Sequence, residues 1–334
     1  MSAASEKASE PLLAIRGLHV EFFTKAGRVP AVRGVDLEVS RGQTLALVGE
    51  SGSGKSVTAM AVLGLVDPPG RITAGEVVFD GRDVTQLPTP ELRALRGRRM
   101  AMIFQEPMTS LNPVFSVGEQ IAEVLRIHLR TPPREARERA IELLARVGIP
   151  AAEQRVDQYP HELSGGMKQR VMIAMALACE PDLLIADEPT TALDVTIQAQ
   201  ILELLAKLQS ELGMAVLLIT HNLGIVAHFA QHVAVMYAGK IVEHASVPEL
   251  FASPAHPYTQ ALLRALPVVG RRERLAAIAG NVPTPLDYPT GCAFADRCPD
   301  VLPHCAARQP ALGSVDAGHE AACWLHDGAS EEGA

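Results

Sequence analysis

Short hydrophobic runs alternate with longer amphipathic segments along most of the chain. The amphipathic segments, clearest at residues 134–147 and 197–212, predict helices because their apolar residues recur at spacings of three and four. The short runs predict β-strands, and strands separated by helices favour an α/β fold with a partly parallel sheet. The runs lie at 18–23, 35–39, 44–48, 77–79, 100–104, 183–187, 216–220 and 233–237.

The pattern changes in three places. Residues 1–11 lack it and predict a disordered tail. Between about residues 106 and 180 helical patterns dominate, which predicts a helical subdomain inserted into the α/β core of residues 12–248. From residue 249 to 334 prolines and cysteines become frequent and periodicity fades, which predicts a small C-terminal domain.

Composition narrows the class of protein. Hydrophobic residues make up 48 % of the 334 residues, enough for a sizeable core. We expect a protein that stays in the cytoplasm, because the chain has no apolar run of about 18 residues and its N-terminus does not resemble a signal peptide. The formal net charge of -8 does not suggest a nucleic-acid partner. Cys179 stands in an apolar run, where we expect a buried core residue.

A glycine-rich motif follows the strand predicted at 44–48. The residues Gly49-Glu-Ser-Gly-Ser-Gly54-Lys55-Ser56 fit G-x-x-x-x-G-K-[ST], and a helix is expected from Lys55. Backbone N–H groups and the helix N-terminus would bind phosphate, Lys55 would reach the β- and γ-phosphates, and Ser56 would bind Mg²⁺. An incidental glycine turn fits these flanking elements poorly. The expected nucleotide-binding residues are Gly49, Ser51, Gly52, Ser53, Gly54, Lys55, Ser56 and Val57.

Two acidic residues end the apolar strand at 183–187. Asp187 would hold the metal, and Glu188 would act as general base on the attacking water. His221 and Gln105 end two further strands, where His221 would contact the γ-phosphate and Gln105 would ligate Mg²⁺ or orient water. Taken alone, the two acids could simply cap a turn, and a lone histidine is more often structural.

A second anion-binding helix start lies far along the chain. The segment Leu163-Ser-Gly-Gly-Met-Lys-Gln-Arg170 opens an apolar helix, with Ser164 placed as its N-cap and Gly165 and Gly166 exposing its first N–H groups. One nucleotide does not need two phosphate cradles. We therefore expect this one to serve the ATP of a partner subunit across a dimer interface.

The order of these motifs resembles an ABC-transporter nucleotide-binding subunit over about residues 12–251. The resemblance implies Gln105 as the Q-loop residue, Asp194 as the D-loop acid, and Ser164, Gly165 and Gly166 as contacts to the partner's γ-phosphate. It places Phe22 at the adenine-stacking position, with Phe23 as a rival and core packing as the alternative. Met167 and Asn222 depart from the commoner Gln and Asp, but neither removes a phosphate contact.

Several strings point to one branch of this family. Residues 104–113, Tyr159–Arg170, Ala255-His-Pro-Tyr-Thr259 and Gly291-Cys-Ala-Phe-Ala-Asp-Arg-Cys-Pro299 resemble the oligopeptide/dipeptide permease ATPases, a branch that includes nickel importers. The resemblance implies ATP and Mg²⁺ as cofactors. It also implies a second, different ATPase subunit, two membrane permeases and an extracytoplasmic solute-binding protein, with this chain at the cytoplasmic face of the membrane.

We therefore expect an ATP-hydrolysing subunit that energises import of di- or oligopeptides. A nickel or other solute importer of the same family is the alternative. A soluble non-transport ABC ATPase is disfavoured, because the chain has one cassette and no long heptad run. A regulatory subunit without turnover is disfavoured by the intact Lys55, Asp187, Glu188 and His221.

Four cysteines cluster near the C-terminus. Cys292, Cys298, Cys305 and Cys323 are separated by 5, 6 and 17 residues. Four thiolates suit zinc or an iron–sulfur cluster, and the wide spacing and Cys298-Pro299 favour a 4Fe–4S cluster. The C-terminal region also resembles a 4Fe–4S-binding one in some peptide-permease ATPases. Zinc, which His304 or His319 could help to bind, and free or incidentally paired cysteines remain alternatives.

Overall fold

The computed structural model of the chain describes residues 10–105, 110–191, 193–266 and 278–326. The tail expected over residues 1–11 lies outside this part except for its last two positions. The chain divides into two compact units. One unit holds Gln86–Leu218, Val39–Gln43 and the chain before Leu13; the other holds Leu13–Glu38, Thr44–Thr85 and the chain from Ile219 onward.

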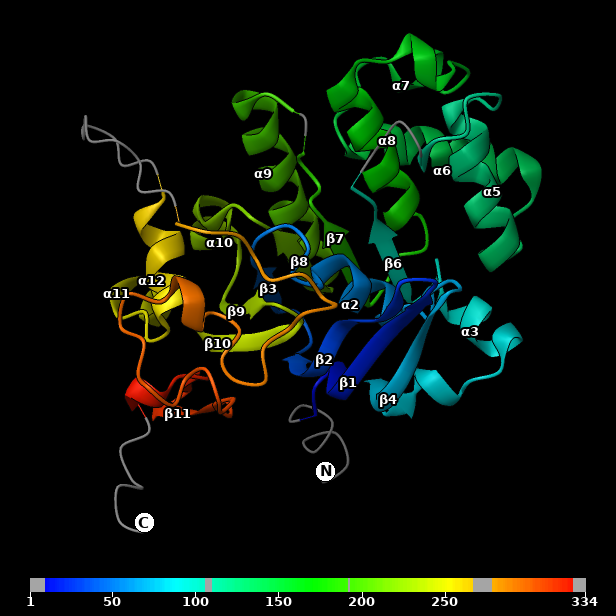
Figure 1. The fold of residues 1–334 in the computed structure, drawn as a ribbon. Coiled ribbons are helices and arrows are strands. Elements are labelled where there is room, and N and C mark those ends of the chain that lie inside the picture. The colour runs from blue at the N-terminus through cyan, green and yellow to red at the C-terminus, as the bar shows by residue number, and fades with distance from the viewer. Residues whose placement is uncertain (1–9, 106–109, 192, 267–277, 327–334) are drawn as a thin grey trace, which may run out of the picture. The chain divides into compact units, whose positions relative to one another are not determined.

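The unit that begins at Leu13 contains an antiparallel sheet in the order β2-β1-β4-β5. Strand β1 pairs with β4 from Leu13 opposite Phe79 to Phe22 opposite Gly70, with register shifts between Arg16 and Val20. Figure 1 shows β1, β2 and β4 side by side. The strands are β1 (Leu13–Thr24), β2 (Gly27–Val39), β4 (Gly70–Phe79) and β5 (Arg82–Asp83), and the 3-10 helix η1 (Val84–Gln86) follows them.

A second group of strands in this unit has the order β11-β12-β10-β9-β3. Strand β3 (Thr44–Val48) is buried at every position and runs parallel to β9 (His232–Tyr237). Such continuous apolar sequence is typical of a strand covered on both faces. The outer strands are antiparallel: β10 (Lys240–Ser246) pairs with β9 and β12 (His319–Ala321), and β12 pairs with β11 (Gly313–Asp316).

Helices α10, α11 and α12 of this unit begin at side-chain caps. Helix α11 has a capping box, in which the Ser246 hydroxyl accepts from the Glu249 N–H and the Glu249 carboxylate accepts from the Ser246 N–H. Asn222 caps α10 and His256 caps α12. The elements are α2 (Lys55–Val62), α10 (Leu223–Phe229), α11 (Val247–Ala252), α12 (Pro257–Arg264), η3 (Ala295–Arg297) and η4 (Trp324–His326).

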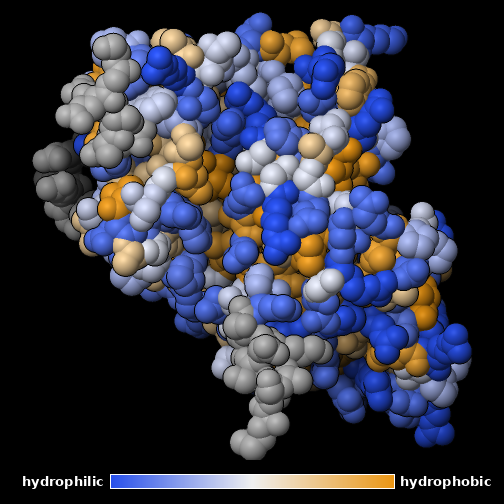
Figure 2. Space-filling model, turned by 90° about the horizontal axis from the view of Figure 1, so that it is seen from below, coloured by the Kyte–Doolittle hydropathy of each residue, from blue (hydrophilic) through white to orange (hydrophobic). Residues whose placement is uncertain are grey.

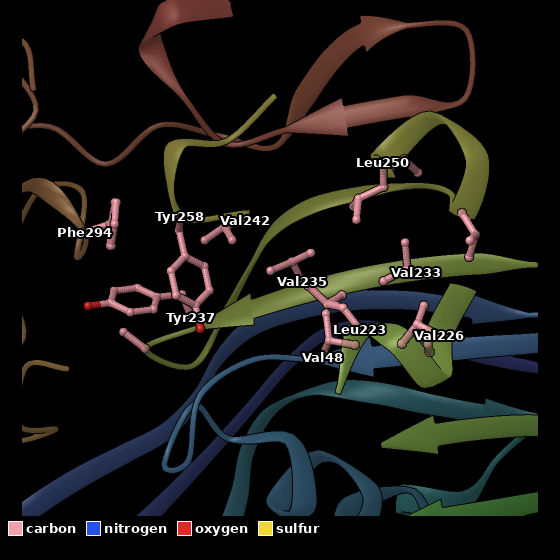
Figure 3. Packing of buried hydrophobic residues seen from close by; sticks show 14 residues of the cluster. Val48, Leu223, Val226, Val233, Val235, Tyr237, Val242, Leu250, Tyr258 and Phe294 are labelled. Atoms are coloured by element: carbon pink, nitrogen blue, oxygen red, sulfur yellow. The ribbon is translucent and has the colours of Figure 1, made fainter. Parts of the chain in front are cut away.

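One hydrophobic cluster joins β3 and β9 to the C-terminal segments. Figure 3 shows Tyr237, Tyr258 and Phe294 at one end of the cluster, away from Val226 and Val233. The Tyr237 and Tyr258 ring centroids are 4.6 Å apart, and Phe294 meets Tyr237 edge-on at 5.4 Å. Aromatic residues bury large areas, so residues distant in sequence share one core here.

The unit around residues 86–218 has strands in the order β8-β7-β6, with β6 parallel to β7. Helix α9 buries Ile201, Leu205 and Leu208, which recur at helical spacing along one face. The strands are β6 (Met100–Ile103), β7 (Leu183–Asp187) and β8 (Ala215–Thr220), and the flanking helices are α3 (Thr89–Leu95) and α9 (Val195–Leu212).

The regular elements described between β6 and β7 are all helices, and Figure 1 shows them together. Ser116 caps α5 by accepting from the Glu119 N–H, and α6 starts with Pro133, whose missing N–H costs nothing at that position. No described helix is long and apolar enough to cross a membrane. The elements are α5 (Val117–Leu129), α6 (Pro133–Arg146), α7 (Ala152–Arg155), η2 (Pro160–Glu162) and α8 (Gly165–Leu177).

The surface seen in Figure 2 is covered mainly by hydrophilic residues, with hydrophobic residues visible between them.

The prediction that Cys179 is a buried core residue is wrong. It follows the end of α8 and is only partly buried, because it lines a cavity of about 590 Å³ among α5, α6 and α8 instead of the core. Burial nevertheless raises the pKa of its thiol.

The side chain of Glu243 is fully buried in β10 and holds two later segments. Its carboxylate accepts hydrogen bonds from the backbone N–H groups of Ala255 and His256, at 2.7 and 2.9 Å. The Nε2 atom of His319 on β12 lies 2.8 Å from the same carboxylate. One acidic side chain thus ties the start of α12 and strand β12 to β10.

We predict that Glu243→Ala lowers the free energy of unfolding by about 3 kcal/mol, because it leaves two buried N–H groups and a histidine without their acceptor. Urea unfolding measures this change. The matched control is Glu320→Gln, which changes a half-exposed carboxylate on the same strand as His319 that lies 3.7 Å from His244, and should cost less than about 0.5 kcal/mol. Equal effects of the two substitutions would contradict the assigned role.

Candidate functional site

The glycine-rich loop joins β3 to α2, as the sequence predicts. At Gly49 a Cβ atom would lie 2.2 Å from the carbonyl oxygen of Met236 on β9, and at Gly54 it would lie 2.5 Å from that of Ala31 on β2. Both glycines also have positive φ, 156° and 106°. The loop therefore approaches two strands so closely that only glycine fits at these positions.

Lys55 is the buried cation of this loop, with 6 % of its surface exposed. Its Nζ donates to the carbonyl oxygens of Gly49 and Glu50, at 2.8 and 2.9 Å, and lies 3.4 Å from the Ser53 hydroxyl. Ser56 and Val57 follow in the first turn of α2. The loop thus brings together a cation and a helix N-terminus, which suit phosphate, and a hydroxyl, which suits Mg²⁺. This combination fits a nucleoside triphosphate bound with Mg²⁺.

The two aromatic candidates on β1 have different surroundings. The Phe23 ring lies under two guanidinium groups, Arg71 at 4.0 Å and Arg28 at 5.6 Å from its centroid. Phe22 lies by Gly70, whose added Cβ would be 2.6 Å from the Phe22 ring and 2.9 Å from Val66 beyond α2. Phe22 therefore lies near Gly70 and Val66, whereas Phe23 lies under the two arginines.

The acidic pair ends β7 in the other unit. Asp187 is 3 % exposed, and Glu188 follows it with φ of 46°, a left-handed conformation that is rare for glutamate. The Glu188 Oε2 accepts from the Gln105 amide at 3.1 Å and from the Thr191 hydroxyl at 2.8 Å. The structure therefore brings Gln105 and Glu188 together.

Thr191 is a contact that sequence reasoning missed. Its N–H also donates to the Glu188 carbonyl oxygen, at 3.1 Å, so both groups of Thr191 close a turn after β7. The available signal was a hydroxyl residue three positions after the glutamate, since Ser and Thr often bond back in such turns.

The second predicted anion-binding site lies at the start of α8, where the Ser164 hydroxyl accepts from the Met167 N–H at 3.4 Å. A Cβ at Gly166 would lie 2.9 Å from Ile197 of α9, so α8 and α9 approach closely there. Asp194 caps α9 by accepting from the Ile197 N–H at 2.9 Å. Residues 106–109 and 192, within two of the motifs, lie outside the described part of the chain.

The candidate residues divide between the two units. His221 is exposed directly after β8, and Asn222 beside it accepts from the Gly224 N–H at 2.9 Å to cap α10. Asparagine therefore performs the capping role at this position. The phosphate loop, Phe22 and His221 belong to one unit; Gln105, Ser164, Gly165, Gly166, Asp187, Glu188 and Asp194 belong to the other.

The four C-terminal cysteines line one small cavity of about 10 Å³, room for at most one water molecule. Burial raises the pKa of the Cys292 and Cys298 thiols and that of Cys323 to about 11. Among the described residues no group of three or more His, Cys, Asp or Glu side chains could hold a metal ion. As placed, the four thiols leave no space between them for zinc or a cluster, so the structure by itself gives no support for the expected metal site.

The two histidines suggested for zinc are engaged elsewhere. His319 lies against Glu243, and the His304 ring contacts Trp324 edge-on at 5.2 Å. Neither lines the cysteine cavity, whose described lining instead includes His256.

Comparison with known proteins agrees with the motifs. Residues 32–191 match the family described as ABC transporter, and residues 242–305 match the oligopeptide/dipeptide transporter C-terminal region. The oligopeptide transport ATP-binding protein AppD of Bacillus subtilis is 52% identical over 97% of this chain and 98% of its own length. The dipeptide transport ATP-binding protein DppD of Escherichia coli is 51% identical over 93% of this chain and 96% of its own.

Solved structures agree on the fold. The dimeric structure of MJ0796, a bacterial ABC transporter cassette, has a TM-score of 0.63 at 29% identity and covers 70% of this chain and 98% of that chain. The structure of cbiO1 from Clostridium perfringens, part of the ABC transporter complex cbiONQ, has a TM-score of 0.62 at 30% identity and covers 73% and 92%. The fold is that of an ABC-type P-loop ATPase. The chain belongs to the ATP-binding proteins of the oligopeptide/dipeptide ABC transporter family.

We predict that Gly49→Ala weakens MgATP binding at least about tenfold, which corresponds to about 1.4 kcal/mol of binding free energy. The new methyl group would push the loop away from Met236. Titration calorimetry of the full-length chain measures the affinity. Gly81→Ala is the control, since Gly81 also has positive φ, 76°, but no atom lies within 4 Å of its added Cβ. Parental affinity in Gly49→Ala would contradict the assigned role of the loop.

Proposed function

We propose that this chain hydrolyses ATP to drive the import of di- or oligopeptides through membrane permeases. The observation that carries the proposal is one chain that combines an ABC cassette, with its lysine held on the glycine loop, and a peptide-transporter C-terminal region. The relatives named for oligopeptide and dipeptide transport match almost the whole chain.

The phosphate loop would bind the nucleotide. Its N–H groups and Lys55 would hold the phosphates, while Phe22 would stack on adenine. Lys55 donates to the carbonyl groups of Gly49 and Glu50, and binding would exchange its longer contact with the Ser53 hydroxyl for a phosphate oxygen, which is a stronger partner of a cation. Bound Mg²⁺ would neutralise phosphate charge, with Ser56, Gln105 and Asp187 as its expected protein ligands.

Glu188 would accept the proton of the attacking water. Hydrogen bonds from Gln105 and Thr191 to its Oε2 fix the direction of the carboxylate. A general base must be positioned before its proton affinity matters, and these two donors supply the positioning. His221 would bind the γ-phosphate.

We also propose that the subunit works in a dimer with a second, different ATPase subunit. Ser164, Gly165 and Gly166 would contact the partner's ATP, since they begin a helix whose N-terminus favours anions. Asp194 would act as the D-loop acid at the same interface. Two permeases and an extracytoplasmic solute-binding protein would complete the complex, with this chain at the cytoplasmic face of the membrane.

The proposed domain limits are 12–248 for the ABC domain, about 106–180 for its helical subdomain and 249–334 for the C-terminal domain. Helices α5 to α8 support the subdomain, because they follow one another between β6 and β7. The match to the transporter C-terminal region at 242–305 supports the last limit.

We predict that Glu188→Gln binds MgATP with parental affinity but hydrolyses it at least about 100-fold more slowly. The amide keeps the shape of the carboxylate but cannot accept the proton. ATPase and peptide-uptake assays on the assembled transporter in vesicles measure this. Glu153→Gln, an exposed position, serves as control. Parental turnover in Glu188→Gln would place the base elsewhere, and uptake of nickel but not peptide would reassign the solute.

The four cysteines are proposed to bind a 4Fe–4S cluster, with zinc as the alternative. Four soft donors around one cavity suit either metal by chemistry, although the loops would have to rearrange to enclose a ligand larger than a water molecule. A structural role fits, because thiolate–metal bonds would link the loops that carry the four cysteines.

We predict that anaerobically purified protein contains about four iron atoms per chain and absorbs near roughly 400 nm. Cys298→Ser should remove both signals, whereas Cys179→Ser, outside the cluster, should keep them. Metal analysis and absorption spectroscopy measure this. One zinc per chain would reassign the metal, and no metal would leave the cysteines as free thiols.

A further inference from the structure

One residue of the phosphate loop is held by the C-terminal segment that carries the cysteines. The Arg297 guanidinium, at the end of η3, makes a two-point contact with the Glu50 carboxylate at 2.7 and 3.1 Å. The two residues are 247 positions apart, and the Arg297 side chain is only 5% exposed. This contact with Glu50 raises the pKa of Arg297. Paired, planar and largely buried contacts of this kind are stronger than surface ion pairs.

Arg297 is itself fixed in place. Its Nε donates to the Ala279 carbonyl oxygen at 2.8 Å, and its Nη1 lies 3.2 Å from the Tyr237 hydroxyl. Its guanidinium also lies over the Phe294 ring, 5.7 Å from the centroid. Because the guanidinium is held by several contacts, it can fix the position of the Glu50 carboxylate.

A second C-terminal side chain holds the backbone of the same residue. The Tyr258 hydroxyl accepts a hydrogen bond from the Glu50 N–H at 2.8 Å. Tyr258 is fully buried, at the start of α12, and packs on Tyr237 and Phe294. In Figure 3 these three aromatic residues lie at the same end of the cluster.

The carbonyl group of Glu50 accepts hydrogen bonds from two residues of the phosphate loop. It accepts from the Lys55 Nζ at 2.9 Å and from the Ser53 N–H at 3.2 Å. Glu50 is thus bound to the C-terminal segments through its side chain and its N–H, and to the loop's phosphate-binding groups through its carbonyl oxygen. A shift of Glu50 would move the acceptor that places Lys55.

We propose that Arg297 and Tyr258 are positioning residues that hold the phosphate loop, through Glu50, in the shape that binds ATP. The inference rests on ATP binding by this loop, as in the proposed function. It makes the C-terminal segment part of the nucleotide site, so that damage to that segment lowers ATP affinity even where the cassette remains folded.

The test measures MgATP affinity of the full-length chain by titration calorimetry, and KM and kcat for ATP in the assembled transporter. Arg297→Gln should raise Kd and KM about tenfold, the effect expected for losing charged hydrogen bonds, while kcat changes less than about twofold. Tyr258→Phe should act in the same direction, because it removes one hydroxyl and keeps the buried ring. Glu50→Gln combined with Arg297→Gln should be no worse than Arg297→Gln alone.

Arg308→Gln is the matched control, an exposed arginine of the same C-terminal region, and should leave Kd unchanged. Circular dichroism and the unfolding temperature report folding, and Tyr258→Phe decides the question if Arg297→Gln does not fold. Affinities within twofold of the parent in folded Arg297→Gln and Tyr258→Phe would overturn the inference, as would additive effects of the two substitutions at Glu50 and Arg297. A parental chain that binds no MgATP would overturn the proposed function itself.

Discussion

The phosphate loop approaches its neighbouring strands so closely that its shape depends on the segments around it. The loop passes within reach of backbone carbonyl groups on β2 and β9, and side chains are excluded at Gly49 and Gly54. A backbone stripped of side chains can turn its N–H groups toward an anion, but it gains no packing energy of its own and costs conformational entropy. The loop must therefore take its shape from what surrounds it, and β9 and the segments packed on it supply much of that surrounding.

The strength of this support depends on how firmly the C-terminal segments are attached. Glu243 does this at one point, because its buried carboxylate binds the chain just before α12 and the histidine of β12. The aromatic group of Tyr237, Tyr258 and Phe294 does it at another, by burying large rings from β9, α12 and the region of η3 together. Polar and apolar contacts thus act on the same elements, and neither set is confined to the cassette that the family's ATPase motifs define.

The sequence predicts these features unequally, and the differences have physical causes. The strands at 44–48 and 183–187 have the predicted bounds, because all their residues are buried and their ends coincide with the loop and the acidic pair. Strand β10 escaped prediction, because it contains a glutamate that is buried only by virtue of partners far along the chain. The glycine motif is visible locally, whereas the contact between Glu50 and Arg297 is not, since both residue types usually belong to the surface.

The two C-terminal strings that resemble peptide-permease ATPases gain a physical explanation from these contacts. In the string 255–259, burial lowers the pKa of His256 to about 3, so its ring stays neutral and its Nδ1 accepts from the Tyr258 N–H at 3.0 Å. That bond starts α12 and directs the Tyr258 hydroxyl to the N–H of Glu50. In the string 291–299, Phe294 packs on Tyr258 while Arg297 reaches the carboxylate of Glu50. Both strings therefore supply a side chain that binds the same residue of the phosphate loop, Glu50.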